Sequence, residues 1–398
     1  MYPEENDPYT PFVSRILRID DTTWGDDKRG YIVRYRGQLT KANSAAAYDE
    51  LAASLRPLNA TPLFRTEQGR HVVYLMQGII QPTRSKVGVN GVLFLLTILT
   101  VLMAGVDYSY AGPAVKNLSE YLGIVKNNLG DGVAFAFTLL AILAAHEFGH
   151  YLAGRYHKTA VTLPYFIPFP LNFFGTMGAF IQLKEPPKNR RILLDIGIAG
   201  PLAGLLVAIP LLLLGLYLSP VETLPVDLLE GQGFEGNSIL YLAMKYLVKG
   251  EMLPQPADYY GVNQLVYWLR YYFTSYPLPA GGKDIILHPI AWAGWAGLLV
   301  TAFNLMPAGQ LDGGHLLYVL LGRKASFALP FILGSLLLLG LVWNGWWLWI
   351  LLLLLLGRYH AEPLDQITPL DPRRKVLAFV GLIVFVLVFV PIPIMISL

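Results

Sequence analysis

The residues best suited to chemistry in this chain are two histidines and a glutamate in the segment His146-Glu147-Phe148-Gly149-His150. Residues four apart on an α-helix share a face, so His146 and His150 would direct two imidazoles toward one point. This spacing is typical of zinc ligands, and the carboxylate of Glu147 would lie where it can remove a proton from an activated water. The alternative is a structural histidine pair held by hydrogen bonds between helices.

The position of this segment strengthens the metal-site hypothesis. It lies within an apolar run from Gly132 to Gly154, which is long enough to cross a bilayer. Ionisable side chains are rare in membrane spans and are usually functional there. A catalytic zinc needs a third protein ligand and leaves its fourth position for water. The chain has no cysteine, so that ligand must be a histidine, an aspartate or a glutamate.

A second group of polar residues occurs far along the chain, in residues 304–315. Asp312 is an acid in an apolar region, and its separation from the basic Arg323 gives it a depth similar to that of His146 if the segment is helical. We therefore expect Asp312 to be the third ligand and Asn304 to donate a hydrogen bond to an oxyanion. His315 is a rival third ligand or a hydrogen-bonding partner of one, and a solvated loop aspartate is the remaining alternative.

The elements that must position these residues are membrane helices. Of the 398 residues, 54% are hydrophobic and 14% are charged, against about 25% charged in soluble domains. This composition predicts an α-helical polytopic membrane protein in contact with lipid, and the small net charge of +3 gives no indication of nucleic-acid binding. We expect seven spans, or six if the fifth and sixth form a re-entrant hairpin: Val87–Val106, Gly132–Gly154, Ile192–Leu218, Pro289–Met306, Phe327–Trp343, Trp346–Gly357 and Val376–Ile396.

Residues 1–85 have the composition of a soluble domain and lack the features of a signal peptide. Alternation predicts strands over Arg29–Arg36, Thr61–Arg65 and His71–Met76, with a turn at residues 67–69, and helical spacing covers Thr40–Leu55. These patterns predict a small α+β domain, with a regulatory role or a passive one, followed by a membrane domain over residues 86–398.

Basic residues in alternate loops predict the orientation in the membrane. Lys86 precedes the first span, Lys188 lies between the second and third, Arg323 follows the fourth and Arg374 precedes the last. Such loops usually face the cytoplasm. We therefore expect a multi-pass protein of the cell membrane whose N-terminal domain and active-site opening are cytoplasmic.

Two further segments border the spans. Three prolines exclude a regular helix from the first half of Thr162–Leu183, and alternation in Phe174–Gln182 indicates an edge strand, with a plain loop as the alternative. At the start of the third span, the pairs Ala199/Ala203 and Gly200/Gly204 indicate close helix packing. Asp195 is expected to form an ion pair with Arg190 or Arg191, or to act as a charge at the helix N-terminus.

The two polar motifs together resemble the site-2 protease family of intramembrane zinc metalloproteases, in its branch without PDZ domains. That family pairs H-E-x-x-H on one span with N-x-x-P-x-x-x-L-D-G on a later one, as His146–His150 and Asn304–Gly313 do here. The resemblance covers a core of about residues 132–321. It implies one Zn2+ per chain on His146, His150 and Asp312, with Glu147 as the base and a membrane-embedded β-hairpin near the site.

The expected function is hydrolysis of peptide bonds within or near the membrane spans of other proteins, with single-span membrane proteins as substrates. A metal transporter or sensor would also use histidine and aspartate in the membrane, although it would need further ligands along a path across the bilayer. An inactive protease-like chaperone is disfavoured by the intact Glu147. The substrate, the oligomeric state and the partner of the N-terminal domain stay open.

Overall fold

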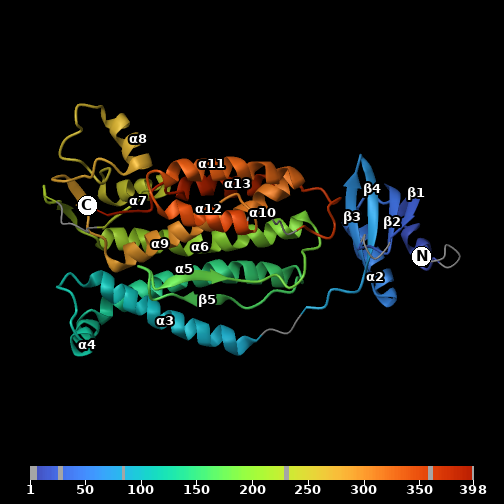
Figure 1. Cartoon of the computed structure of the whole chain (residues 1–398), viewed down its shortest axis with the longest axis horizontal. Helices are drawn as coiled ribbons and strands as arrows, with labels where there is room; N and C mark the ends of the chain where they lie inside the picture. The colour runs from blue at the N-terminus through green and yellow to red at the C-terminus, as the bar shows by residue number, and fades with distance from the viewer. Residues whose placement is uncertain (1–6, 26–29, 83–85, 228–232, 357–361, 397–398) are drawn as a thin grey trace.

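The computed structural model describes residues 7–25, 30–82, 86–227, 233–356 and 362–396. Long apolar helices lie side by side and form most of the molecule, and a small sheet lies beyond one end of them (Figure 1). The N-terminus is at the sheet end, and the C-terminus is at the opposite end, near α7 (Ile239–Lys249) and α8 (Gln264–Thr274). The expected boundary between residues 1–85 and 86–398 falls at residues 83–85, outside the described residues, so it stays a prediction.

The N-terminal sheet has the strand order β1-β2-β4-β3, with every neighbouring pair antiparallel. Its strands are β1 (Leu17–Trp24), β2 (Val33–Leu39), β3 (Ala60–Glu67) and β4 (Arg70–Gln77), and α1 (Thr10–Val13) and α2 (Ser44–Leu55) accompany them. Gln68 and Gly69 both have positive φ, which is the two-residue turn that suits a twisted hairpin. Sequence patterns indicated β2, α2, β3 and β4, whereas β1 was missed because Asp and Thr dominate it.

Four helical stretches of the described residues are long and apolar enough to cross a membrane: α3 (Val87–Ser109), α5 (Leu129–Tyr156), α6 (Arg190–Leu218) and the run Asp312–Gly340. That run contains α10 (Asp312–Leu321), the 3-10 turn η3 (Gly322–Phe327) and α11 (Ala328–Gly340). Large apolar side chains stay exposed on these helices; Leu95 is 67% exposed and Phe331 is 78% exposed. Such surfaces suit a lipid environment.

The expected count of seven spans is not confirmed. The helix α9 (Pro289–Asn304) has 16 residues, α12 (Gly345–Leu356) has 12 and α13 (Pro372–Val388) has 17. Gly357, the expected end of the sixth span, is outside the described residues. The last predicted span is wrong at its end, because α13 stops at Val388. Pro391 and Pro393 follow shortly afterwards, and proline cannot continue a helix.

Three two-stranded sheets connect the helices. The strand β5 (Tyr165–Pro168) pairs antiparallel with β6 (Thr176–Phe180), in the region where an edge strand was predicted. The pairs β7 (Val221–Thr223) with β9 (Lys283–Ile285) and β8 (Gly233–Glu235) with β10 (Ile394–Ile396) lie at the opposite end of the bundle from the N-terminal sheet. The β5–β6 hairpin runs alongside α5 (Figure 1).

A short connecting segment, residues 362–371, joins the N-terminal domain to the helices. The Phe64 amide of β3 donates to the Leu364 carbonyl at 2.9 Å, and the Asp365 amide donates to the Lys188 carbonyl at 2.7 Å. Leu364 and Ile367 also pack against the core of the N-terminal domain. The segment therefore lies between β3 and the loop that precedes α6, and its hydrogen bonds link the sheet to that loop.

Asp195 of α6 has a partner that the sequence did not indicate. Its carboxylate accepts hydrogen bonds from the guanidinium of Arg374 on α13 at 2.6 and 2.8 Å, and His157 Nε2 lies 2.9 Å from it. The expected ion pair therefore forms with Arg374 in place of Arg190 or Arg191, because the tertiary packing brings α13 and the end of α5 to the first turns of α6.

Candidate metal centre

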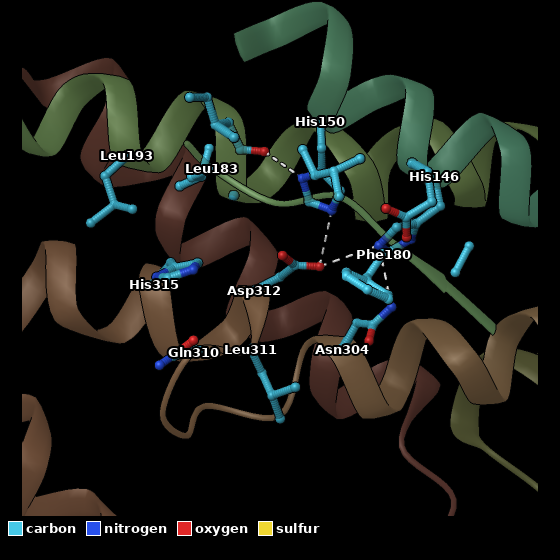
Figure 2. A pocket seen from close by; sticks show the side chains of 15 residues that line it. His146, His150, Phe180, Leu183, Leu193, Asn304, Gln310, Leu311, Asp312 and His315 are labelled. Carbon is cyan, nitrogen blue, oxygen red and sulfur yellow. Dashed lines mark hydrogen bonds and ion pairs between the residues drawn. The ribbon is translucent and has the colours of Figure 1, made fainter. Parts of the chain in front are cut away.

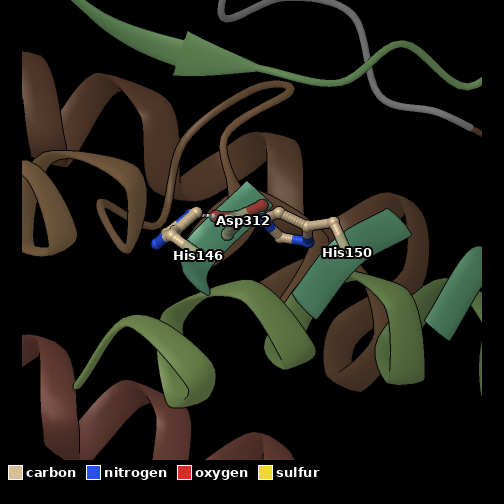
Figure 3. Close-up of side chains that lie close together, drawn as sticks. All are labelled: His146, His150 and Asp312. Atoms are coloured by element: carbon tan, nitrogen blue, oxygen red, sulfur yellow. Dashed lines mark hydrogen bonds and ion pairs between the residues drawn. The ribbon is translucent and has the colours of Figure 1, made fainter. Parts of the chain in front are cut away.

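The predicted metal ligands from two distant segments meet inside the bundle. His146 and His150 are buried on one face of α5, and Asp312 is the first residue of α10. Asp312 Oδ2 lies 3.2 Å from His146 Nε2 and 3.3 Å from His150 Nε2 (Figure 3). One ligand atom from each residue lies within 4.8 Å of the others, and this is the group of potential metal ligands found among the described residues.

The geometry and chemistry of this group fit a zinc ion. Two imidazole nitrogens and one carboxylate oxygen form a donor set of the catalytic type, which leaves one position open. Tetrahedral ligands at 2.0–2.1 Å from zinc are about 3.3 Å apart, and the two separations given above agree with this value. Asp312 Oδ2 therefore lies at the distance from each histidine that a shared zinc ion requires.

The orientation of His150 is fixed by α6. Its Nδ1 lies 2.7 Å from the carbonyl oxygen of Ile196, and a carbonyl can only accept, so Nδ1 carries the proton and donates it. The lone pair is then on Nε2, the atom that faces Asp312. A hydrogen bond from the other ring nitrogen to a carbonyl is the usual support of a metal-binding histidine.

Glycines allow α6 to approach the histidines this closely. A Cβ added to Gly200 would lie 2.0 Å from His150 Nε2, and one added to Gly204 would lie 3.2 Å from His146 Cβ. On the other side of the contact, a Cβ on Gly149 would lie 2.5 Å from the Ala199 carbonyl oxygen. Gly200 and Gly204, the small residues that predicted close helix packing, thus lie against the two histidines of the metal centre.

The loop between α9 and α10 brings Asp312 to the histidines. Gly309 has a φ of 56°, and the loop folds back so tightly that a Cβ on Gly313 would lie 1.8 Å from the Leu305 carbonyl oxygen. A Cβ on Gly314 would lie 2.4 Å from the Gly309 carbonyl oxygen. These contacts fix the first turn of α10 against the end of α9, and so they fix the depth of Asp312 relative to α5.

Glu147 and Asn304, the two predicted catalytic residues, line the same cavity as the three ligands, a space of about 200 Å3 (Figure 2). Asn304 Nδ2 is 3.3 Å from His146 Nε2. Glu147 is 4% exposed, and Ile181, directly after β6, lines the cavity beside it. Ala179 and Phe180 also line the cavity. Residue types alone did not single out these backbone positions; the alternation of the segment was the available signal.

His315, the rival third ligand, is not part of the group of potential ligands. It lines the cavity from the next turn of α10, and its Cβ is 3.3 Å from the position of an added Cβ on Gly197. Figure 2 shows it on the far side of Asp312 from His146. The geometry therefore favours Asp312 over His315 as the third ligand.

Comparison with known proteins agrees with this arrangement. The family model described as Peptidase family M50 matches residues 134–337, which contain both polar motifs. Two proteins named "Probable zinc metalloprotease EGY1, chloroplastic" are each 32% identical to the chain: the one from Oryza sativa subsp. japonica over 261 residues, 64% of this chain and 40% of that protein, and the one from Arabidopsis thaliana over 263 residues, 65% and 42%.

A further relative, "Probable zinc metalloprotease EGY2, chloroplastic" from Oryza sativa subsp. indica, is 31% identical over 269 residues, 67% of this chain and 44% of that protein. The chain thus spans less than half the length of these relatives. No solved structure matches it. The family match covers just over half of the chain and runs from within α5 to within α11. The chain therefore belongs to peptidase family M50, the site-2 protease family, as its two motifs predicted.

Proposed function

We propose that this protein is an intramembrane zinc endopeptidase that cleaves membrane-spanning segments of other proteins. The observation that carries the proposal is the meeting of His146, His150 and Asp312 beside the buried carboxylate of Glu147, between helices with lipid-facing surfaces. A carboxylate next to a three-ligand site with an open position is the arrangement that metal-assisted peptide hydrolysis requires.

His146, His150 and Asp312 would hold the ion, and a zinc ion bound there supplies a Lewis acid that polarises a carbonyl group and acidifies water. Glu147 accepts the proton of the attacking water and afterwards delivers it to the leaving amine. Asn304 donates from its side-chain amide to the oxygen on which negative charge develops.

The strand β6 is the proposed binding surface for the unwound substrate. A helical substrate cannot present its carbonyls, since they are already hydrogen-bonded, so it must first become extended. In the described residues β6 pairs with β5 along one edge only, and its end borders the cavity through Ala179 and Phe180. An extended peptide added to the other edge would pass the metal centre, with backbone hydrogen bonds supplying affinity for any sequence.

We further propose that the β5–β6 hairpin is embedded in the membrane, and that the substrates are single-span membrane proteins. The N-terminal domain and the opening of the site are assigned to the cytoplasmic side of a cell membrane. Contacts of basic loop residues with the N-terminal end support this assignment: Lys188 pairs with Asp49 at 2.9 Å, and Arg323 lies 3.4 Å from Glu362 in the connecting segment. Loops of this charge usually stay in the cytoplasm.

Substitution of Glu147 by Gln tests the proposal. The variant keeps the shape of the side chain and all three ligands, so zinc content of the purified protein should be unchanged. Cleavage of a panel of single-span substrates should be abolished, because the amide cannot accept the proton. Glu120→Gln, at a half-buried acid on α4 (Leu118–Asn127), is the matched control and should keep full activity. A Glu147→Gln variant that cleaves at the wild-type rate would contradict the role given to this residue. The structure adds no observation that favours the metal-transport alternative.

A further inference from the structure

A second cavity lies far from the metal centre, at the end of the bundle that carries the C-terminus. We call it the β8–β9 cavity; its volume is about 340 Å3, and Glu235 and Asp284 are the two acids in its wall. The remaining walls are largely apolar and come from five elements and the hairpin loop, and they include Tyr108, Phe173, Phe234, Ile285, Trp292 and Ile394. No step of the proposed proteolysis uses this cavity.

The cavity has one more negative charge than the structure balances when both acids are ionised. Lys245 of α7 is fully buried and lies 2.9 Å from Glu235 Oε1, which also accepts a hydrogen bond from the Tyr241 hydroxyl at 3.1 Å. Glu235 and Lys245 therefore satisfy each other. Asp284 Oδ1 is 3.8 Å from Lys245 Nζ and accepts a hydrogen bond from the Ile285 amide.

The second carboxylate oxygen of Asp284, Oδ2, accepts no hydrogen bond in the part of the chain that the structure describes. Asp284 is 5% exposed, and the buried polar atoms without a partner include Nε1 of Trp292 in the same wall but not Oδ2, so Oδ2 is open to the space of the cavity. Burial, together with the neighbouring Glu235, raises the pKa of Asp284 to about 7, although Lys245 and the Ile285 amide oppose the shift. An acid in this position is poorly stabilised when it is ionised. A cation that enters the cavity would stabilise the ionised carboxylate of Asp284.

The rest of the wall suits the apolar part of such a ligand. The rings of Tyr108 and Trp292 stack at 5.2 Å with an interplanar angle of 9°, and both line the cavity. Aromatic faces attract cations as well as methylene groups. A ligand with an ammonium or guanidinium group on an apolar stem therefore matches both the acid and the wall.

The hairpin loop links this cavity to the proposed substrate path. Phe173 lines the β8–β9 cavity, and the adjacent Phe174 packs on Trp292 and Trp295 with ring centroids 5.5 and 6.3 Å away. From Phe173 the chain continues through β6 to Ile181 at the metal centre. A peptide extended along this stretch needs on the order of eight residues to reach from one cavity to the other.

We propose that the β8–β9 cavity binds a lysine or arginine side chain of the substrate, at the flank of its membrane span, and so helps to set where the substrate is cleaved. The cationic end pairs with Asp284, and the methylene stem lies against Tyr108 and Trp292. This inference rests on the proposed function for the identity of the ligand. The affinity of the cavity for a cationic amphiphile does not depend on proteolysis.

The first test measures binding alone. Calorimetric titration of the full-length Glu147→Gln protein with n-butylamine should give saturable binding, and the neutral isostere n-butanol should bind at least tenfold more weakly. Affinity for the amine should rise as the pH increases through about 7, because Asp284 must be ionised to pair with it. The other groups facing Asp284 are Lys245, Glu235 and the tyrosines Tyr241, Tyr267 and Tyr271.

Asp284→Asn should lower the affinity for n-butylamine at least tenfold and remove the pH dependence. Asp258→Asn, at an exposed acid that caps a nearby turn, is the matched control and should change neither. If Asp284→Asn folds poorly, the pH dependence of n-butylamine binding to the Glu147→Gln protein, which retains Asp284, still tests the proposal. Equal affinity for the amine and the alcohol, or an unaltered affinity in Asp284→Asn, would overturn the proposal.

The second test identifies the source of the cation. Single-span substrates carrying one lysine, moved residue by residue along the flank, should show a maximum of kcat/KM at one position in the active protein. That maximum should disappear in Asp284→Asn and persist in the control Asp258→Asn. If the amine binds but every lysine position is cleaved equally, the cavity takes a free amine and the assignment to the substrate is wrong.

Discussion

Substitution of Gly200 by alanine should disable the metal centre without touching any ligand. The added Cβ would lie 2.0 Å from His150 Nε2, which is 1.4 Å closer than the 3.4 Å at which ordinary contact begins. It would also lie 2.4 Å from Cδ2 and 2.5 Å from Cε1 of the same ring, so no small rotation relieves the overlap. His150 must leave its position, or α6 must move away from α5.

Either movement has a cost that can be worked from the contacts. Displacing the ring breaks the 2.7 Å hydrogen bond from His150 Nδ1 to the Ile196 carbonyl, which fixes the ligand. Loss of such support lowers metal affinity about 10–100-fold, and a misplacement of about 1 Å lowers catalytic rates about 100-fold. Moving the helix instead forces extra volume into a packed interface, which costs about 1–3 kcal/mol of stability.

Two neighbouring glycines on the same helix provide matched controls. A Cβ on Gly197 would meet His315 Cβ at 3.3 Å, and one on Gly204 would meet His146 Cβ at 3.2 Å, so both alanine variants need shifts of only a few tenths of an ångström. Gly200→Ala should therefore have a much higher zinc dissociation constant in chelator competition than the other two variants. Its cleavage rate and its unfolding temperature should be lower than theirs. Equal zinc affinity and activity in Gly200→Ala and Gly197→Ala would refute the reasoning.

Three other substitutions test separate parts of the structure. Asp312→Ala should reduce zinc affinity by orders of magnitude in chelator competition, whereas His315→Ala should reduce it only modestly; the reverse order would assign the third ligand to His315. Lys245→Ala leaves two buried carboxylates without their cation and should lower stability by about 3–5 kcal/mol, and unaltered thermal unfolding would contradict this. Asp365→Ala should cost about 1–3 kcal/mol and expose the connecting segment to protease, because the carboxylate accepts from the amides of Ile367 and Thr368. Asp365→Asn keeps an acceptor and should have little effect, so equal losses in both variants would exclude this explanation.

The N-terminal domain illustrates how far local patterns lead. Alternation and turn residues are local properties, so β2, α2, β3 and β4 were predictable to within a few residues. The polar strand β1 and the connecting segment were not, because both take their structure from partners elsewhere in the chain. Phe64 and Asp365 are neighbours only in the folded protein, and no periodicity in residues 362–371 indicates a strand-like contact.

For the membrane domain, the sequence by itself determined the family, the apolar helices and the five residues proposed for the metal centre. Their types and spacing are properties of a helix and of the reaction, so they can be read without coordinates. Only the tertiary structure decided that Asp312 rather than His315 meets the two histidines, because the depth and rotation of α10 depend on the backward fold of residues 305–311. It also decided that Gly200 borders a ligand and that Arg374 pairs with Asp195, since the faces two helices turn toward each other depend on how the whole bundle packs.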